Sequence, residues 1–255
     1  MRNVSSPVDD PVFGTPLEQG GWVVRLARDD DLGAVLALRG RVFRGGADDT
    51  DAHDAASLHL WIGRAGQGPR ATLRLRLHED AESLLSGYAA QHYDLTALAA
   101  AGGRVLELGR LCAEGPAMDA DLLRLVWAGV ARIALRTGTA RLIGCTSFHT
   151  TEAASLDPAL ALLRARHLGP DDLRPGRKAP EARGVEAAGV PPRPEAAALM
   201  PPLLRVYLAM GGWVSDHLVV DRDLGTCHVF TCVDIAAMPS ARRRSLSRLA
   251  GEEGA

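Results

Sequence analysis

Lysine is almost absent from this sequence, since Lys178 is the only lysine and 28 of the 29 basic residues are arginine. The formal net charge is only -2, and this balance gives no overall reason to expect binding to nucleic acid. No run of 18 or more apolar residues occurs, so we predict no membrane-spanning helix. The N-terminal stretch has acidic residues and no apolar core, so we do not expect a signal peptide.

Cysteine is scarce and scattered. The chain has no CxxC motif, and no histidines stand at the spacing of metal ligands, so we predict no bound metal and no permanently bound cofactor. We expect free thiols in a reducing, cytoplasmic compartment. Two of them, Cys112 and Cys145, are expected to be small core residues, because nothing nearby in the sequence would activate a thiol. The four positions are Cys112, Cys145, Cys227 and Cys232.

The length of 255 residues and the apolar content of 47% predict one globular domain with embellishments. We place this domain at residues 21–240. Residues 1–20, rich in Pro, Gly and Asp, are predicted to be a disordered lead-in. Residues 168–194, rich in Pro, Gly, Arg and Glu, are predicted to be a mobile insertion, and residues 241–255 a charged tail.

The periodicity of apolar residues predicts alternating strands and helices. The order is strand, helix, β-hairpin, short helix, strand, helix, strand and helix, then one more helix and two strands. We therefore predict an α/β fold with a mixed central sheet flanked by helices. The predicted strands lie at 21–27, 57–63, 69–77, 104–112, 140–148, 217–220 and 227–235, and the helices at 29–43, 93–103, 119–138, 155–167 and 201–212.

The strand "VLELGRLC" carries two charges, Glu107 and Arg110, within an apolar run. A buried charge costs several kcal/mol unless it is paired or used. The two residues are three positions apart and would point to opposite faces of a regular strand. A β-bulge at Gly109 would bring both side chains to one side, and it would expose backbone N–H groups.

Four charged motifs occur in order along the chain: "RGRVF" (Arg39–Phe43), "DAHD" (Asp51–Asp54), "ATLR" (ending at Arg74) and "ELGR" (Glu107–Arg110). Together they resemble the GNAT-like acyltransferases, and more specifically the ornithine-lipid N-acyltransferases and the related acyl-homoserine-lactone synthases. The segments "YDLTAL", "LELGRLC", "IGCTSF" and "PPLLRVYLAMGGWV" look like the first of these two families. The resemblance runs from about residue 22 to 239, interrupted by the insertion.

This resemblance implies a GNAT-like fold and an enzyme that transfers a 3-hydroxyacyl group from acyl carrier protein to the α-amino group of L-ornithine. The product would be the lyso-ornithine lipid. One alternative is an acyl-homoserine-lactone synthase, and another is an N-acyltransferase for a different amino acid. A third alternative is not an enzyme but a non-catalytic module that binds acyl carrier protein.

The reaction needs a base, because an α-amino group with a pKa of about 8 is mainly protonated at neutral pH. We predict that Glu107 is this base, with its pKa raised by burial in an apolar strand, and that it faces a channel for the pantetheine arm. His149, in "SFHTT" after a strand, is a rival base, although a loop position without a catalytic role is the ordinary interpretation. The oxyanion site and the acyl pocket are assigned to Gly109, Leu111, Thr146 and Ser147.

Substrate binding is assigned to charged residues of the four motifs. Asp51 and Asp54 would bind the ammonium groups of ornithine, unless they belong to a solvated acidic loop. Arginines would bind the substrate carboxylate or hold the two aspartates, and the sequence does not say which arginine does which. The arginines are Arg39, Arg74 and Arg110. In the structural alternative, Glu107 and Arg110 simply join this network of ion pairs.

The turn "AEGPAMDAD" before the long helix contains Glu114, Asp119 and Asp121. Acids at a helix N-terminus repel a diphosphate, which disfavours free coenzyme A and favours phosphopantetheine on acyl carrier protein. That partner is acidic, so a basic docking face is expected. Candidates are Arg124, Arg132, Arg136, Arg141, Arg174, Arg177 and Lys178, each of which is otherwise a solvated residue.

The C-terminal run "SARRRSLSR" is expected either to be merely solvated or to make transient peripheral contact with the anionic inner membrane.

Overall fold

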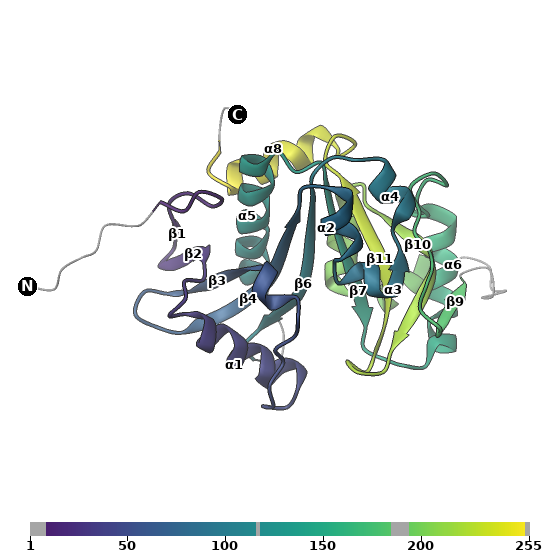
Figure 1. Ribbon diagram of the computed structural model, residues 1–255, viewed down its shortest axis with the longest axis horizontal. Coiled ribbons are helices and arrows are strands. Elements are labelled where there is room, and N and C mark those ends of the chain that lie inside the picture. Colours follow the sequence, from purple (N-terminus) through teal and green to yellow (C-terminus); the bar gives the residue numbers. More distant parts are fainter. Residues whose placement is uncertain (1–8, 116–117, 185–193, 253–255) are drawn as a thin grey trace, which may run out of the picture. The chain divides into compact units, whose positions relative to one another are not determined.

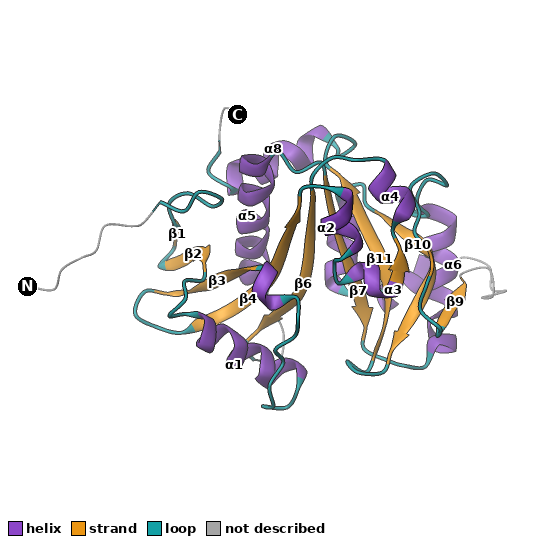
Figure 2. Cartoon of the chain, viewed as in Figure 1, coloured by secondary structure: helices purple, strands orange, loops and turns teal. Residues whose placement is uncertain are grey.

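A computed structural model describes residues 9–115, 118–184 and 194–252, and it divides the chain into two compact units. Unit 1 consists of residues 1–76, 108–139 and 240–255, and unit 2 consists of residues 77–107 and 140–239. Strands β4 (Pro69–His78) and β6 (Val105–Ala113) each have residues in both units. The elements of each unit are labelled in Figure 1 and coloured by type in Figure 2.

Unit 1 contains a sheet in the order β1-β2-β3-β4-β6, and its pairs from β1 to β4 are antiparallel. The predicted hairpin is present, with Leu60 of β3 opposite Leu73 of β4. The other elements of this unit are β1 (Leu17–Gln19), β2 (Trp22–Leu26), α1 (Leu32–Phe43), β3 (Leu58–Arg64), α5 (Ala120–Thr137), α8 (Ser240–Leu249) and a 3-10 helix at Asp54–Ala56.

Helix α5 begins and ends where the sequence predicts. The side chain of Asp119 accepts a hydrogen bond from the backbone N–H of Leu122, which caps the first turn, and Gly138 ends the helix with a φ of 63°. The helix contacts β2 and β3. Gly129 lies at this contact, because a Cβ there would be 2.8 Å from the side chain of Leu60. The absence of that carbon allows the helix to pack closely on the sheet.

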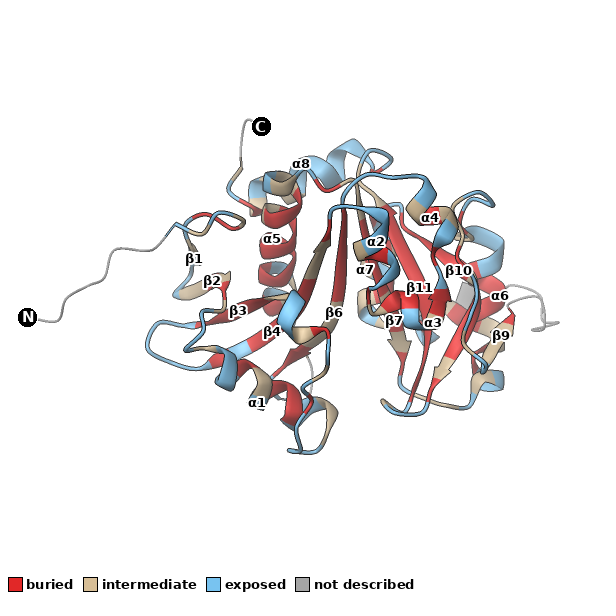
Figure 3. Ribbon diagram, in the orientation of Figure 1, coloured by how far each residue is buried: buried red, intermediate tan, exposed pale blue. Residues whose placement is uncertain are grey.

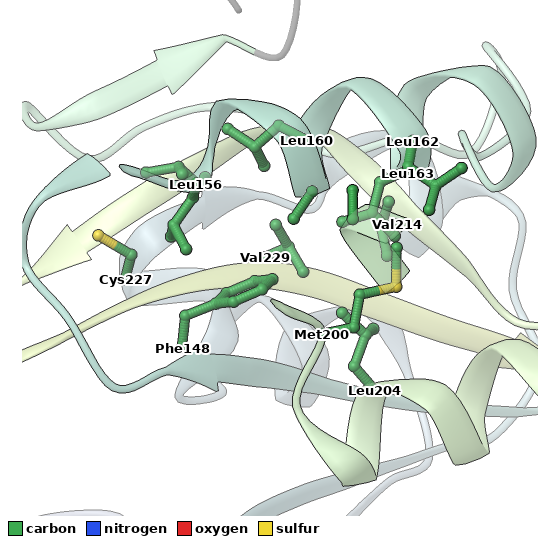
Figure 4. Packing of buried hydrophobic residues seen from close by; sticks show 13 residues of the cluster. Phe148, Leu156, Leu160, Leu162, Leu163, Met200, Leu204, Val214, Cys227 and Val229 are labelled. Carbon is green, nitrogen blue, oxygen red and sulfur yellow. The ribbon is translucent and has the colours of Figure 1, made fainter. Parts of the chain in front are cut away.

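Unit 2 contains strands in the order β6-β7-β11-β10-β9, with antiparallel pairs from β7 to β9. Helix α6 and the segment before α7 pack with strands β7, β10 and β11 around an apolar core that includes Phe148, Leu160 and Val229 (Figure 4). The elements are α2 (Ala81–Leu85), α3 (Ala89–His92), β5 (Tyr93–Asp94), α4 (Thr96–Ala100), β7 (Arg141–Phe148), α6 (Asp157–Arg166), β8 (Gly176–Arg177), β9 (Ala182–Gly184), α7 (Pro202–Ala209), β10 (Trp213–Asp221), β11 (Thr226–Asp234) and 3-10 helices at Ala153–Leu156 and Pro194–Leu199.

Two predictions need correction, one about the N-terminal end and one about the insertion. Residues 9–20 are not a disordered lead-in, since Phe13 is fully buried and β1 pairs with β2, whereas residues 1–8 lie outside the described part. The predicted insertion contains strands β8 and β9, the second paired with β10, although residues 185–193 are not described. The predicted tail forms helix α8, which contacts α5 and is largely exposed (Figure 3).

Two compact units, rather than one, make up the predicted domain of residues 21–240. Their segments alternate along the chain, so the sequence shows no linker between them. Among the described residues, no helix is long and apolar enough to cross a membrane.

Candidate functional site

The centre of the charged cluster in unit 1 is Arg39, on the inner face of α1 and fully buried. Its Nε donates to Asp49 Oδ2 at 3.0 Å, and its Nη2 donates to the backbone oxygen of Asp49 at 2.7 Å. The same guanidinium donates to both carboxylate oxygens of Asp54, at 2.5 and 3.2 Å. The charge of Arg39 is therefore paired with two carboxylates, and such pairing is needed to offset the cost of burying a guanidinium.

Arg74 of β4 and Arg110 of β6 complete the cluster. Arg74 Nη1 donates to Asp51 Oδ1 at 2.5 Å and to Asp54 Oδ1 at 3.0 Å. Arg110 donates to Asp49 Oδ2 at 3.0 Å and to Asp51 Oδ2 at 3.3 Å. Three arginines and three aspartates therefore form one network, which we call the ionic cluster (Arg39, Asp49, Asp51, Asp54, Arg74 and Arg110).

The sequence prediction that Arg39, Asp51, Asp54, Arg74 and Arg110 lie together agrees with this geometry, and their role in substrate binding stays a prediction. The contacts show the arginines paired with the aspartates, which is the structural alternative for these residues. Asp51 is the most accessible member, with a quarter of its side chain exposed. Sequence reasoning missed Asp49, because nothing in "ADDTDAHD" distinguishes the one acid that is fully buried.

The backbone of β6 has an unusual conformation at Arg110, the residue after Gly109, and the β-bulge at Gly109 stays a prediction. Arg110 has a φ of 51°, and it is the only described residue other than glycine with a positive φ. This left-handed conformation costs a side-chain-bearing residue about 1–2 kcal/mol. The hydrogen bonds from its guanidinium to Asp49 and Asp51 offset this cost and hold the conformation in place.

The guanidinium groups keep the carboxylates ionised. Burial acts to raise the pKa of Asp54, but hydrogen bonds from Arg39, the Asp51 backbone and Arg74 outweigh it and lower the pKa to about 2. The pKa of Asp51 is also lowered, because its hydrogen bond to Arg74 and the charge of that residue outweigh burial. The carboxylates of Asp51 and Asp54 are therefore ionised at neutral pH.

Glu107 lies in unit 2 and is not a member of the ionic cluster, since its partners are a histidine and two backbone N–H groups. Its Oε2 is 2.9 Å from Nε2 of His78 and accepts from the N–H of Tyr88 at 3.2 Å, while Oε1 accepts from the N–H of Ala89 at 2.6 Å. The backbone approaches closely at Gly87, where a Cβ would lie 2.7 Å from Glu107 Oε2. The carboxylate is buried, with 5% of the residue exposed.

One expectation for Glu107 is wrong, because the pKa of its carboxylate is lowered instead of raised. The carboxylate is largely enclosed by its partners, and a pantetheine channel beside it stays a prediction. Burial does act to raise this pKa, as expected, but hydrogen bonds from His78 and from the two backbone N–H groups outweigh it. A carboxylate held in its ionised form is a poor proton acceptor, although it orients a histidine well.

His78, the last residue of β4, is 1% exposed and was not predicted. With Nε2–H donating to Glu107, its Nδ1 carries the lone pair, and this buried atom has no hydrogen-bond partner among the residues that the structure describes. A signal was present in the sequence, because His78 follows Arg74 and Arg76 at a spacing of two and so points to the same face of the strand.

The remaining predicted site residues are spread over both units. Gly109 and Leu111 are partly exposed positions of β6 in unit 1, whereas Thr146 and Ser147 are neighbours on β7 in unit 2. The hydroxyl of Thr146 is 3.0 Å from that of Thr231, in the interior of the β7–β11 pair. Their assignment to an oxyanion site and acyl pocket stays a prediction. His149 is exposed just beyond β7.

Cys112, in β6, is buried, and burial raises the pKa of its thiol to about 12. Such a thiol does not ionise at neutral pH, in agreement with the expectation of a core residue.

Several arginines of the predicted docking face have partners within their own unit. Arg132 and Arg136 approach Glu252 at 3.3 and 3.6 Å, and Arg141 lies 3.7 Å from Asp234. Lys178 donates to the backbone oxygen of Ala90 at 2.7 Å. These contacts favour a structural role for much of the set.

Comparison with known proteins agrees with the motifs. An acetyltransferase (GNAT) domain model matches residues 38–128. The chain is 32% identical over 246 residues to an L-ornithine N(alpha)-acyltransferase of Rhodobacter capsulatus, an alignment that covers 89% of this chain and 95% of that protein. A second L-ornithine N(alpha)-acyltransferase, from Agrobacterium fabrum, is 26% identical, with 98% and 92% of the two chains covered.

Among solved structures, an N-acyl amino acid synthase from uncultured soil microbes has a TM-score of 0.50 at 11% identity, with 88% of this chain and 95% of that one covered. This likeness concerns the fold alone. The fold is of the GNAT class, as predicted, with a mixed central sheet and flanking helices. The domain model and the Rhodobacter capsulatus relative show that the protein is an acyltransferase. Within that class, the chain belongs to the L-ornithine N(alpha)-acyltransferase family.

Proposed function

We propose that this acyltransferase moves a 3-hydroxyacyl group from acyl carrier protein to the α-amino group of L-ornithine, giving the lyso-ornithine lipid. The observation that carries the proposal is the match to a protein named L-ornithine N(alpha)-acyltransferase over 95% of that protein's length. The reaction forms one amide bond and breaks one thioester, and it releases the pantetheine thiol on the carrier. The amine loses a proton in the process.

The proton acceptor in this proposal is the pair formed by Glu107 and His78. Glu107 keeps its charge, fixes the His78 tautomer through Nε2–H, and stabilises the imidazolium that forms when Nδ1 accepts a proton. Glu107 is then a positioning residue, and His78 Nδ1 is the atom that takes the proton, directly or through water. A positioned base of this kind contributes about 10²- to 10⁴-fold to a rate.

In the ionic cluster, the proposed contact with ornithine is Asp51. Ornithine is cationic, and the carboxylate of Asp51 is the least enclosed of the three aspartates. The other members are proposed to hold this carboxylate in place, since Asp51 is bonded by both Arg74 and Arg110.

The N-terminus of α5 supports an acyl donor other than free coenzyme A. The Asp119 carboxylate already accepts from the N–H of Leu122 at 2.7 Å, so this turn presents a negative charge where a diphosphate would need donors. Glu114, on the same connection, lies 3.4 Å from Arg70. We therefore propose acyl carrier protein as the partner and its phosphopantetheine as the acyl carrier.

The test is a reconstituted reaction with purified protein, 3-hydroxyacyl-acyl carrier protein and an equimolar mixture of amino acids including ornithine, analysed by mass spectrometry. The proposal predicts 3-hydroxyacyl-ornithine as the main product, and a much lower rate with the matching acyl-coenzyme A. A different acyl amino acid as the main product would overturn the ornithine assignment. Release of methylthioadenosine from added S-adenosylmethionine would instead identify an acyl-homoserine-lactone synthase.

The product has a fatty chain, and we propose transient contact of α8 with anionic lipid. Arg242, Arg243 and Arg244 are exposed on this helix, and each arginine near such a surface contributes about 1 kcal/mol. Sedimentation with phosphatidylglycerol vesicles should retain the protein at low salt and release it at high salt. Replacing the three arginines with serine should abolish retention, and unchanged retention would contradict the proposal.

A further inference from the structure

A second polar group of unit 2 has no part in the proposed reaction. It consists of His92 at the end of α3, Asp221 at the end of β10, and His228 in β11. One nitrogen or oxygen from each of these side chains lies within 4.8 Å of the other two. Asp221 and His228 are buried, and His92 is half-buried. This group could not be found from sequence spacing, because 128 residues separate His92 from Asp221.

The orientation of His228 is fixed by Tyr93. The Tyr93 hydroxyl donates to the backbone oxygen of His228 at 2.9 Å and lies 3.0 Å from Nδ1 of the same residue. The hydroxyl has one proton, so both contacts are satisfied only when Nδ1–H donates to the Tyr93 oxygen. The lone pair of the imidazole is then on Nε2.

That Nε2 atom is buried and has no hydrogen-bond partner among the residues described. His228 is 1% exposed, and an unsatisfied buried acceptor costs about 1–3 kcal/mol. The nearest ring is that of His92, with centroids 4.9 Å apart and an edge-on arrangement. A histidine metal ligand usually donates a hydrogen bond from one ring N–H to an oxygen, while the lone pair of its second ring nitrogen binds the metal.

Asp221 supplies the third group. Its Oδ1 accepts from the N–H of Leu224 at 3.0 Å, and its Oδ2 lies 3.4 Å from the Tyr88 hydroxyl, which is a long contact. A carboxylate held in this way keeps lone pairs for another partner.

We propose that His92, Asp221 and His228 bind a divalent transition-metal ion, with zinc as the best match. Two imidazoles and one carboxylate are a common zinc ligand set, with a water molecule in the fourth position. Zinc–ligand distances of about 2.1 Å place tetrahedral ligands roughly 3.4 Å apart. The three atoms lie within 4.8 Å of one another, so ligation would bring them closer together.

The role proposed for the ion is structural. It joins α3 to β10 and β11, two consecutive strands of unit 2 that are far from α3 in the chain. Helix α3 also provides the Ala89 N–H that donates to Glu107 at 2.6 Å, so the ion steadies one of the donors that hold this carboxylate. The proposal does not depend on acyl transfer, and its test needs no substrate.

The test is zinc binding to the full chain after treatment with a chelator and dialysis. Isothermal titration should show one equivalent bound, and a 100-fold excess of zinc over Kd should raise Tm by about 5 °C or more. His92→Ala and His228→Ala should each abolish both effects. His149→Ala, which removes an exposed histidine of the same unit, is the matched control and should behave like the unaltered protein.

Cobalt(II) gives a second readout that does not depend on how stable the variants are. One equivalent added to the unaltered protein should produce the visible absorption of a tetrahedral site, and one equivalent of zinc should abolish it. No stoichiometric zinc binding, or binding that His92→Ala leaves unchanged, would overturn the proposal.

Discussion

In unit 1, three buried guanidinium groups meet three carboxylates, whereas in unit 2 a single buried carboxylate meets one imidazole and two backbone N–H groups. The ionic cluster is matched charge by charge, and most of its hydrogen-bonding capacity is used internally. The pair of Glu107 and His78 leaves one ring nitrogen without a described partner. The ionic cluster is suited to holding the loop of the aspartates against β4 and β6. The pair of Glu107 and His78 is suited to accepting a proton.

The comparison also shows why burial alone does not reveal a base. Asp54 is half-buried and Glu107 is buried, and in both cases burial acts to raise the pKa. Hydrogen bonds lower it again in both. The difference lies in the partner, because a guanidinium only donates hydrogen bonds, whereas an imidazole that donates from one ring nitrogen can accept at the other.

The largest expected effect is on catalysis. Glu107→Gln keeps the size of the side chain and removes its charge, so the His78 imidazolium loses its stabilising partner. We predict a fall in kcat of about 10²- to 10⁴-fold for acyl transfer to ornithine, with KM for ornithine little changed. Steady-state kinetics measures both constants, and circular dichroism checks the fold. An unchanged kcat would exclude a role for Glu107 in the reaction.

The largest expected effect on stability belongs to the ionic cluster. Arg39→Met leaves Asp49 and Asp54 without their main partner, so we predict a loss of about 3–5 kcal/mol in the free energy of unfolding. The control is Arg44→Met, which removes a more exposed partner of Asp49 and should cost no more than about 1 kcal/mol. Urea denaturation compares the two variants, and equal losses would contradict the account of a buried, matched centre.

A smaller effect is expected from crowding the pair in unit 2. A Cβ at Gly87 would lie 2.7 Å from Glu107 Oε2 and 3.0 Å from a His78 ring carbon, so Gly87→Ala must displace one of them. We predict a loss of about 1–3 kcal/mol in stability together with a lower kcat. Gly68→Ala is the control, since a Cβ there meets nothing within 4 Å and should change the stability by less than about 0.5 kcal/mol. Full activity in Gly87→Ala would show that the pair tolerates displacement.

The smallest expected effect is on the stability of the protein at acidic pH. The folded-state pKa of Asp54 is about 2, below its ordinary value of 3.8. Its stabilising contribution is therefore complete above about pH 5 and is lost as the pH falls through 3.8 toward 2. The stability difference between the unaltered protein and Asp54→Asn should narrow over this range when urea denaturation is repeated at several pH values. A constant difference would mean that Arg39 and Arg74 do not depress this pKa.

Much of the fold was predictable because its signals are local. Asp119 and Gly138 bound α5 as cap residues, and alternating residues in β3 and β4 form the predicted hairpin. The short elements were missed, among them β1 and α3, because three or four residues are too few to show a period. Composition also led to a wrong prediction at the N-terminal end. Phe13 is fully buried, although it lies in a segment whose Pro, Gly and Asp content predicts disorder.

The candidate site was predictable only in part. Five members of the ionic cluster are motif residues, and the structure brings them together. The partner of Glu107 was not predicted, because 28 residues lie between it and His78 and only the fold brings them within 2.9 Å. The same limit applies to His92, Asp221 and His228, whose proximity depends on how α3 packs near β10 and β11.

The most direct test of the central claim is a double-mutant cycle on kcat with His78→Gln, Glu107→Gln and the variant that carries both changes. If Glu107 acts through His78, each single change lowers kcat to a similar level, and the double change lowers it no further. If the two losses multiply in the double variant, the residues act independently, and the pair is not the proton acceptor of this acyltransferase.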